Sequence, residues 1–272
     1  MSKQRRSRRQ FLKSSITTAA GMAWVAGRGS PAGAQTAAAP AAPARAARLK
    51  FAAIGLNHGH IGGQVDSVKR GGGQLVSFYA KEPDLADAFA KRYPEAKRAR
   101  SEQEILEDPE IKLVVSASIP DERAPLGIQV MKHGKDFMVD KPGMTTLDQL
   151  AQARRVQAET KRIYSILYSE RLENRATVKA GELVKAGAIG RVIQTIGMGP
   201  HRMTPKTRPA WFFEKEHYGG ILTDIASHQF DQFLFFTGSN QAEIVASQVG
   251  NVAHPQWPGL EDFGDVMLHG NG

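Results

Sequence analysis

The chain has 272 residues, no cysteine and a formal net charge of +9. Residues 1–48 hold nine of the 36 Lys and Arg side chains and no acid, which leaves 27 basic against 27 acidic residues in 49–272. Because this body is neutral, the sequence excludes the basic footprint that binding to a nucleic-acid backbone requires. The absence of cysteine excludes disulfides and thiolate metal sites.

The N-terminus has the pattern of a twin-arginine export signal. Ser7-Arg8-Arg9-Gln10-Phe11-Leu12-Lys13 places paired arginines before Phe-Leu-Lys, and residues 14–27 form a short, mildly apolar stretch. That stretch is too short for a permanent membrane helix. Because Ala32-Gly33-Ala34 offers small residues to signal peptidase, we expect residues 1–34 to be removed and the mature periplasmic protein to begin at Gln35. A disordered basic tail is the alternative.

Residues 35–48 are mostly Ala with Pro and two Arg, which indicates a linker or an extended arm. In residues 49–168, short apolar runs alternate with amphipathic stretches. The runs predict strands at 49–55, 74–80, 113–118, 136–139 and 163–167. Helices are expected at 59–70, 84–93, 124–133 and 146–160, with a shorter one that Ser101 and Glu104 cap and that ends near 108–109. This alternation predicts a doubly wound parallel sheet with helices on both faces.

After Ser169 the pattern changes to that of a second, mixed α/β domain over residues 169–272. We expect a helix at 174–186, a strand at 191–197, a Pro-containing loop, a helix at 222–237, and strands at 243–250 and 263–269. The chain ends at Gly270-Asn271-Gly272, a strong hairpin turn signal with no strand after it. This predicts that the second domain is incomplete.

The glycine-rich turn after the first predicted strand is the first candidate site. It reads Gly55-Leu56-Asn57-His58-Gly59-His60-Ile61-Gly62-Gly63 and would present backbone N–H groups to a dinucleotide pyrophosphate. Only Gly55 matches G-x-G-x-x-G, because Asn57 and His60 replace the other glycines. The candidate cofactor contacts in this turn are Gly55, Asn57, His58, Gly59, His60 and Ile61. His58 and His60 form an H-x-H pair that suggests a metal ion, but hydrogen bonding or solvation is favoured, so no metal is predicted.

Two further strand ends supply candidate cofactor contacts. The second strand ends in Tyr79-Ala80-Lys81, where a site preferring NAD would place an acid for the ribose hydroxyls. Lys81 therefore favours the 2′-phosphate of NADP slightly, although a solvated surface lysine explains it equally well. Ser118 and Pro120 follow the next strand and complete the cofactor set.

The candidate chemistry lies in two segments. Asp140-Lys141-Pro142 follows a buried strand, which places Lys141 at the carboxyl edge of the sheet, where nicotinamide and substrate would meet. Asp224, His228 and Asp231 share one helix face at spacings i, i+4 and i+7. That polar stripe is either a structural network or a general acid/base assembly.

These segments resemble the Gfo/Idh/MocA family of nicotinamide-dependent oxidoreductases over about residues 49–272. Asp140-Lys141-Pro142 is similar to the family's E-K-P motif, with aspartate for glutamate, and residues 219–228 (GGILTDIASH) match G-G-x-L-x-D-x-x-x-H. Gly187-Ala188-Ile189-Gly190 is similar to the family's G-x-I-G turn. The resemblance implies a Rossmann domain over 49–168, followed by an α/β domain with an open mixed sheet.

The resemblance also implies roles and ligands. Lys141 would orient the substrate hydroxyl and the nicotinamide, His228 would exchange the hydroxyl proton, and Asp224 would position the substrate or the histidine. The implied cofactor is a tightly bound NAD or NADP, and it would contact Asp140 and Lys141. The implied substrate is a sugar, cyclitol or related polyol. Exported members of the glucose-fructose oxidoreductase type retain the cofactor with an N-terminal arm, a role expected here for residues 35–48.

Several expectations about partners and alternatives follow. The protein would pass through the twin-arginine translocase already folded and would form a homo-oligomer through the open sheet. A glycosidase that uses NAD by transient oxidation shares the same site, and a non-catalytic binding protein could keep the same fold. Specificity would lie largely in the loop 200–218 and in the missing C-terminal part. In the loop, a sugar or anionic ligand could meet His201, Arg202, Lys206, Arg208 and Trp211, although a solvated loop explains these charges equally well.

Overall fold

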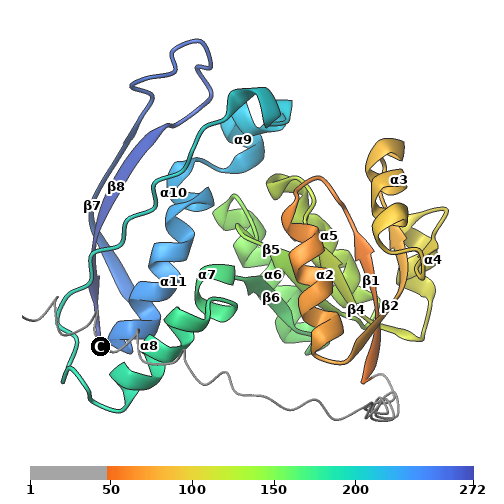
Figure 1. Cartoon of the computed structure of the whole chain (residues 1–272), viewed down its shortest axis with the longest axis horizontal. Helices are drawn as coiled ribbons and strands as arrows, with labels where there is room; N and C mark the ends of the chain where they lie inside the picture. The colour runs from red at the N-terminus through yellow and green to blue at the C-terminus, as the bar shows by residue number, and fades with distance from the viewer. Residues whose placement is uncertain (1–47) are drawn as a thin grey trace, which may run out of the picture. The chain divides into compact units, whose positions relative to one another are not determined.

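The computed structural model describes residues 48–272 (Figure 1). These residues belong to one compact unit. The predicted export signal and residues 35–47 of the predicted arm lie outside the described residues. Within the described part, no helix combines the length and the apolarity needed to cross a membrane.

A six-stranded parallel sheet forms the N-terminal half, with strand order β3-β2-β1-β4-β5-β6. Its strands are β1 (Leu49–Ile54), β2 (Gly73–Tyr79), β3 (Lys97–Arg98), β4 (Ile111–Ser116), β5 (Asp136–Asp140) and β6 (Tyr164–Leu167). The central β1 carries four consecutive residues that are at most 1% exposed, Phe51 to Ile54, because both faces of the sheet are covered. The predicted doubly wound parallel sheet is therefore confirmed.

Helices cover the two faces of this sheet (Figure 1). They are α2 (His60–Arg70), α3 (Pro83–Arg92), α4 (Glu102–Glu107), α5 (Pro120–Lys132) and α6 (Leu147–Thr160). One core joins α2 and α3 to β1 and β2 through side chains such as Val65, Phe78 and Phe89. The other joins α4 and α5 to β4 and β5 through side chains such as Ile105 and Val130. The strand order changes direction between β1 and β4, which opens a crevice at the carboxyl ends of these strands.

Helix α5 begins four residues before its predicted start. Pro120 occupies the first helical position, where its missing N–H is harmless. Pro125 lies inside the helix and leaves the Asp121 carbonyl without its usual i+4 donor. The Gln149 side chain of α6 supplies that donor, with Nε2 2.8 Å from the Asp121 oxygen. A tertiary contact thus stabilises a helix that the local sequence does not favour.

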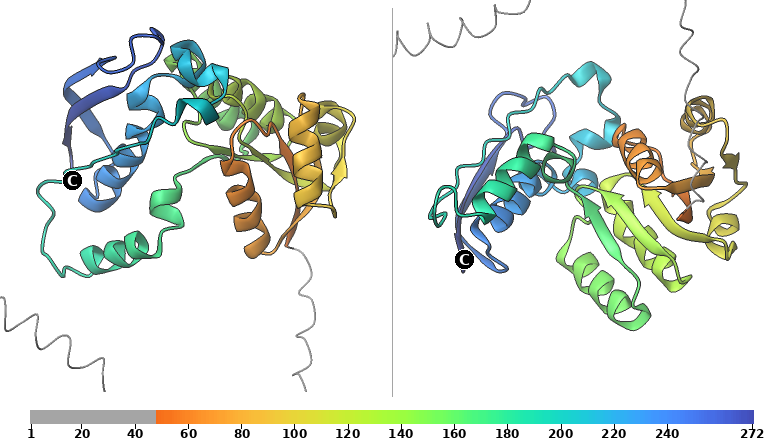
Figure 2. Two further views of the ribbon diagram at one scale, coloured as in Figure 1. Left: turned by 45° about the horizontal axis from the view of Figure 1, so that its top comes forward. Right: turned by 60° about the horizontal axis from the view of Figure 1, so that its bottom comes forward.

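The C-terminal part contains helices and a two-stranded antiparallel sheet (Figure 2). The helices are α7 (Ser169–Leu172), α8 (Arg175–Lys185), α9 (Lys215–Tyr218), α10 (Ile221–Asp224) and α11 (Ala226–Thr237), with 3₁₀ turns at Pro205–Thr207 and Ala210–Phe213. Strands β7 (Ala242–Gly250) and β8 (Phe263–Gly270) pair from Ala242 with Gly270 to Gly250 with Phe263.

Two predictions for the C-terminal part are wrong. The strand expected at 191–197 does not form, because its backbone pairs with no strand among the described residues, and Ile193 and Ile196 are more than 80% exposed. The single helix expected at 222–237 breaks at Ile225, between α10 and α11. There the Asp224 carbonyl accepts from the Ser227 hydroxyl at 3.1 Å, and the His228 N–H bonds the Ile225 carbonyl instead.

Candidate active site

The turn after β1 packs tightly against the end of β4. Gly55 has φ +75, and a Cβ built on it would lie 2.5 Å from the Ser118 Cβ, so only glycine fits at this position. The His58 N–H donates to the Ala117 carbonyl at 2.9 Å and fixes the turn to the neighbouring strand. Helix α2 follows at once, with no side-chain cap and no acid in its first turn. Its N-terminal N–H groups are therefore suited to an anion.

A cavity of about 330 Å³ adjoins this turn at the carboxyl ends of β1, β2 and β4. The predicted cofactor contacts that line it are Gly55, Asn57, Lys81 and Ser118. Other predicted contacts lie elsewhere: Ile61 is buried in the core under α2, Gly59 is the N-cap of α2, and Pro120 is the first residue of α5. A cavity at this strand crossover, with an uncapped helix N-terminus beside it, fits a dinucleotide.

Both a basic and an acidic side chain from just after the end of β2 line this cavity. Lys81 donates to Glu122 at 3.1 Å, and this hydrogen bond raises the pKa of the lysine. Glu82, which the sequence reasoning passed over, accepts from the Asn57 amide at 2.8 Å. The acid that Ala80 does not supply is thus present two residues later in the same cavity.

Asp140, at the end of β5, is 2% exposed and accepts from several donors. The Nδ1 atoms of His58 and His60 each lie 3.0 Å from a different oxygen of its carboxylate, and the Lys141 N–H is 2.9 Å away. Burial alone would raise the pKa of Asp140, but the two histidines and the guanidinium of Arg123 hold it well below its usual range. The carboxylate is therefore ionised. Burial also lowers the pKa of His58.

Arg123 of α5, which the sequence reasoning missed, holds the turn formed by residues 140–142. Its side chain is 1% exposed. It donates to the carbonyls of Ser118 at 2.7 Å, Lys141 at 2.6 Å and Pro142 at 2.9 Å, and it lies 3.3 Å from the Asp140 carboxylate. The Lys141-Pro142 peptide bond is cis. Arg123 thus fixes the backbone from which Lys141 extends.

Two of the three predicted catalytic residues, Lys141 and Asp224, contact each other across the two halves of the chain. The Lys141 Nζ donates to the Asp224 carboxylate at 2.7 Å and lies 3.3 Å from the Asp224 carbonyl oxygen. Both side chains are buried. His228, 2% exposed, follows in the first turn of α11. The break at Ile225 brings the carbonyl and carboxylate of Asp224 to the same ammonium group.

Glu170 of α7 is a second residue that the sequence reasoning missed. Its carboxylate forms an ion pair with Nδ1 of His228. Partial burial would raise the pKa of Glu170, but the hydrogen bond and the charge of His228 lower it to about 2. Because Nδ1 faces Glu170, Nε2 is the ring nitrogen available for proton exchange.

Asp231 has a structural role rather than a place in the polar stripe that the sequence suggested. Its carboxylate makes a two-point ion pair with the Arg171 guanidinium, with one contact at 2.7 Å. This pair joins α11 to α7. It therefore holds in place the helix that carries Glu170.

The residues singled out in the loop 200–218 lie in different places: His201, Arg202 and Arg208 line a large cavity, whereas Trp211 lies near the glycine turn. His201, Arg202 and Lys206 are exposed, and Arg208 stacks over Phe212 with its guanidinium carbon 4.2 Å from the ring centroid. Trp211 lies near the glycine turn, with its ring centroid 6.5 Å from that of His58. A larger cavity of about 950 Å³ lies between residues 191–203 and β8, and its lining includes none of Lys141, Asp224 and His228.

The fold and the motif order define a class of dinucleotide-dependent oxidoreductases. Residues 49–168 match the family model described as the oxidoreductase family with an NAD-binding Rossmann fold, and residues 177–272 match the GFO/IDH/MocA C-terminal domain. The chain belongs to the Gfo/Idh/MocA family.

Relatives in this family include dehydrogenases of cyclitols and sugars. The chain is 27% identical to scyllo-inositol 2-dehydrogenase (NAD(+)) of Bacillus subtilis, over 80% of its own length and 61% of the relative. It is 26% identical to levoglucosan dehydrogenase of Pseudarthrobacter phenanthrenivorans, over 59% of this chain and 42% of that one. The chain spans about three fifths of the length of the first of these relatives.

Solved structures share the same fold. A protein from Erwinia carotovora atroseptica, described only as an oxidoreductase, superposes with a TM-score of 0.80 at 43% identity, over 82% of this chain and 67% of that chain. The complex of levoglucosan dehydrogenase with NADH and levoglucosan superposes with a TM-score of 0.71 at 20% identity, over 82% of this chain and 64% of that chain. At 20% identity, this second likeness concerns the fold alone.

Proposed function

We propose that this protein is an NAD(P)-dependent oxidoreductase that transfers hydride to or from a secondary alcohol carbon of a sugar, cyclitol or related polyol. The observation that carries the proposal is the 2.7 Å contact between Lys141 and Asp224; His228 follows four residues later, in the first turn of α11. Two relatives are named as dehydrogenases of scyllo-inositol and levoglucosan, and these names support the proposal of a polyhydroxylated substrate.

The chain's own residues divide the work. A bound nicotinamide would accept or return the hydride. Gly55, Asn57 and Ser118 would hold the dinucleotide in the cavity at the strand ends. The Lys141 ammonium, oriented by Asp224, would stabilise the developing alkoxide-like oxygen of the substrate. His228, with Nδ1 held by Glu170, would take the hydroxyl proton at Nε2.

We also propose that the mature protein works in the periplasm with a cofactor that it acquires before export. The paired arginines of residues 8–9 support this route. An exported enzyme has no free nicotinamide pool to draw on, so the cofactor would be retained and recycled. Deleting residues 35–48 tests the arm: unchanged nucleotide retention after purification would limit those residues to a spacer.

The central experiment combines native mass spectrometry with a substrate panel. We expect full-length protein to carry about one nicotinamide dinucleotide per chain and to change its redox state when cyclitols or sugars are added. His228→Ala and Lys141→Ala should each lower kcat by about 10²–10⁴-fold. His133→Ala, a change at an exposed position directly after α5, is the matched control and should leave kcat unchanged.

Two outcomes would overturn the proposal. Protein that neither retains nor binds a nicotinamide dinucleotide cannot be this enzyme. Release of an aglycone from nitrophenyl glycosides, without net change in the nicotinamide redox state, would replace the dehydrogenase with a glycosidase that uses the same residues.

A further inference from the structure

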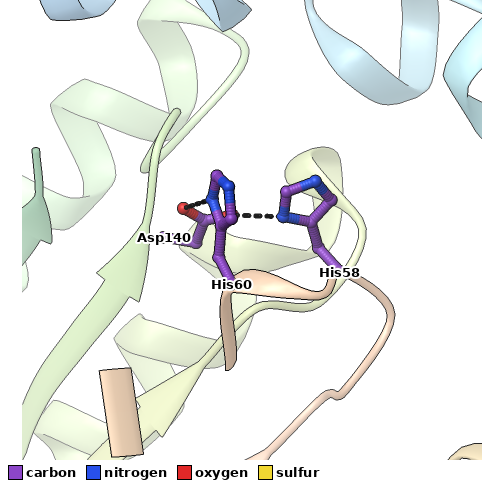
Figure 3. Close-up of side chains that lie close together, drawn as sticks. All are labelled: His58, His60 and Asp140. Carbon is purple, nitrogen blue, oxygen red and sulfur yellow. Dashed lines mark hydrogen bonds and ion pairs between the residues drawn. The ribbon is translucent and has the colours of Figure 1, made fainter. Parts of the chain in front are cut away.

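The H-x-H pair of the glycine turn is not explained by dinucleotide binding. His60 stands where the glycine fingerprint has its third glycine, and neither His58 nor His60 lines the cavity beside the turn. Instead, both imidazoles turn toward the Asp140 carboxylate (Figure 3). Three side chains from two separate segments, β5 and the turn after β1, thus converge on one point.

The geometry of this cluster is close to that of a metal site. The His58 and His60 rings meet edge to face at 84°, with centroids 4.2 Å apart, so each directs Nδ1 at the same carboxylate. Both Nδ1-to-oxygen distances are 3.0 Å, and the ligand atoms of all three residues lie within 4.8 Å of one another. A four-coordinate zinc ion with bonds of about 2.0–2.1 Å holds its ligand atoms about 3.3 Å apart.

We propose that His58, His60 and Asp140 bind a divalent transition metal ion of the zinc class. Two imidazole nitrogens and a carboxylate suit this class better than Mg²⁺ or Ca²⁺, which prefer oxygen ligands. Three protein ligands leave a fourth position for water or for an oxygen of a bound ligand. The His60 side chain is 49% exposed, which gives an ion an entry path.

The neighbouring cations are compatible with such an ion. Arg123 keeps its place mainly through backbone carbonyls, those of Ser118, Asp140, Lys141 and Pro142, and its contact with the Asp140 carboxylate is the longest of the set at 3.3 Å. Lys141 directs its ammonium at Asp224, away from Asp140. A dication would therefore replace the contacts of the two imidazoles with Asp140, while the contacts of Arg123 and the Lys141 N–H with this carboxylate stay in place.

The test measures metal binding directly and does not depend on catalysis. Full-length protein without a polyhistidine tag is stripped with a chelator, checked for folding by circular dichroism, and dialysed against Zn²⁺, with bound metal counted by mass spectrometry. We expect about one Zn²⁺ per chain and a Co²⁺ adduct with visible d–d absorption. His60→Ala and, separately, His58→Ala should weaken Zn²⁺ binding by at least about tenfold.

The exposed His133→Ala variant is the matched control and should bind Zn²⁺ like the wild type. Protein that binds no stoichiometric Zn²⁺ overturns the proposal. Zn²⁺ binding that is equally strong in folded His58→Ala and His60→Ala protein also overturns it, because the ion would then lie elsewhere. Neither result bears on nicotinamide binding, which is measured separately.

Discussion

The contact between Lys141 and Asp224 predicts that stability and catalysis respond differently to a pair of substitutions. The two side chains retain only 7% and 11% exposure. Lys141→Met or Asp224→Leu alone leaves one buried charge without its partner, which costs about 3–5 kcal/mol for a fully buried pair. With the residual exposure, we expect about 3 kcal/mol for each variant, which is a fall in Tm of about 6–12 °C for a domain of this size.

The double variant Lys141→Met/Asp224→Leu should be much more stable than the sum of the single changes, because no unpaired charge remains. Urea unfolding of the four proteins gives the coupling energy, which we expect to exceed about 2 kcal/mol. Activity should not recover with stability, because the double variant lacks the ammonium that we propose stabilises the substrate oxygen. A coupling energy below about 0.5 kcal/mol would refute the pairing seen in the structure.

Three further predictions follow from the surroundings of the site. Arg123→Leu removes the donor to the carbonyls of Ser118, Lys141 and Pro142 and should cost about 2–4 kcal/mol in urea unfolding, and Arg123→Lys, which lacks the planar fork, should recover less than half of that loss. His228 lowers the pKa of Glu170 to about 2. The free energy of unfolding of the wild type should therefore exceed that of Glu170→Gln by its full amount above pH 4.5, and this difference should vanish as the pH falls toward 2. A difference that grows on acidification would contradict this ion pair. Lys81→Ala should lower the ratio of kcat/KM for NADP to that for NAD by about tenfold, and Glu82→Ala should raise it. Steady-state kinetics with both cofactors would give the wild-type ratio in both variants if neither side chain meets the ribose.

Local sequence was sufficient for the parallel sheet because its strands are buried on both faces. Runs such as residues 49–55 and 113–118 are recognisable without knowledge of their neighbours, although the structure starts and ends the latter strand two residues earlier. Once the sheet is parallel, the residue after β5 must lie at the carboxyl edge, so Lys141 could be placed as well. The contact of Lys141 with Asp224 could be expected only from the family resemblance, because 83 residues separate the two.

The failures share one physical cause, which is that they depend on partners distant in the chain. The strand expected at 191–197 has the right composition but pairs with no strand within residues 48–272. The continuous helix expected at 222–237 breaks where the Asp224 carbonyl bonds the Ser227 hydroxyl and lies 3.3 Å from the Lys141 ammonium. No local pattern encodes either the absence of a partner or competition by a remote side chain.

The missed residues were hidden for the same reason. Arg123 lies in a helix whose start is obscured by Pro125, and an arginine in such a helix is expected to be a solvated surface residue. Only the structure shows that its guanidinium donates to the carbonyls of Lys141 and Pro142. Glu170 is one of many acids in the sequence, and only the position of α7 beside α11 gives it His228 as a partner. The weak signal available for Glu82 was its position two residues after Ala80 in the sequence.

Two departures from the family pattern prove to be one structural feature. In sequence, aspartate at 140 in place of glutamate and His60 in place of glycine are separate oddities, 80 residues apart. In the structure they touch, because the Asp140 carboxylate lies 3.0 Å from Nδ1 of His60 and at the same distance from Nδ1 of His58. A glycine at position 60 would remove one hydrogen-bond donor from the buried Asp140 carboxylate. The altered glycine turn and the altered lysine motif are therefore coupled, and substitutions at either should be judged by their effect on the other.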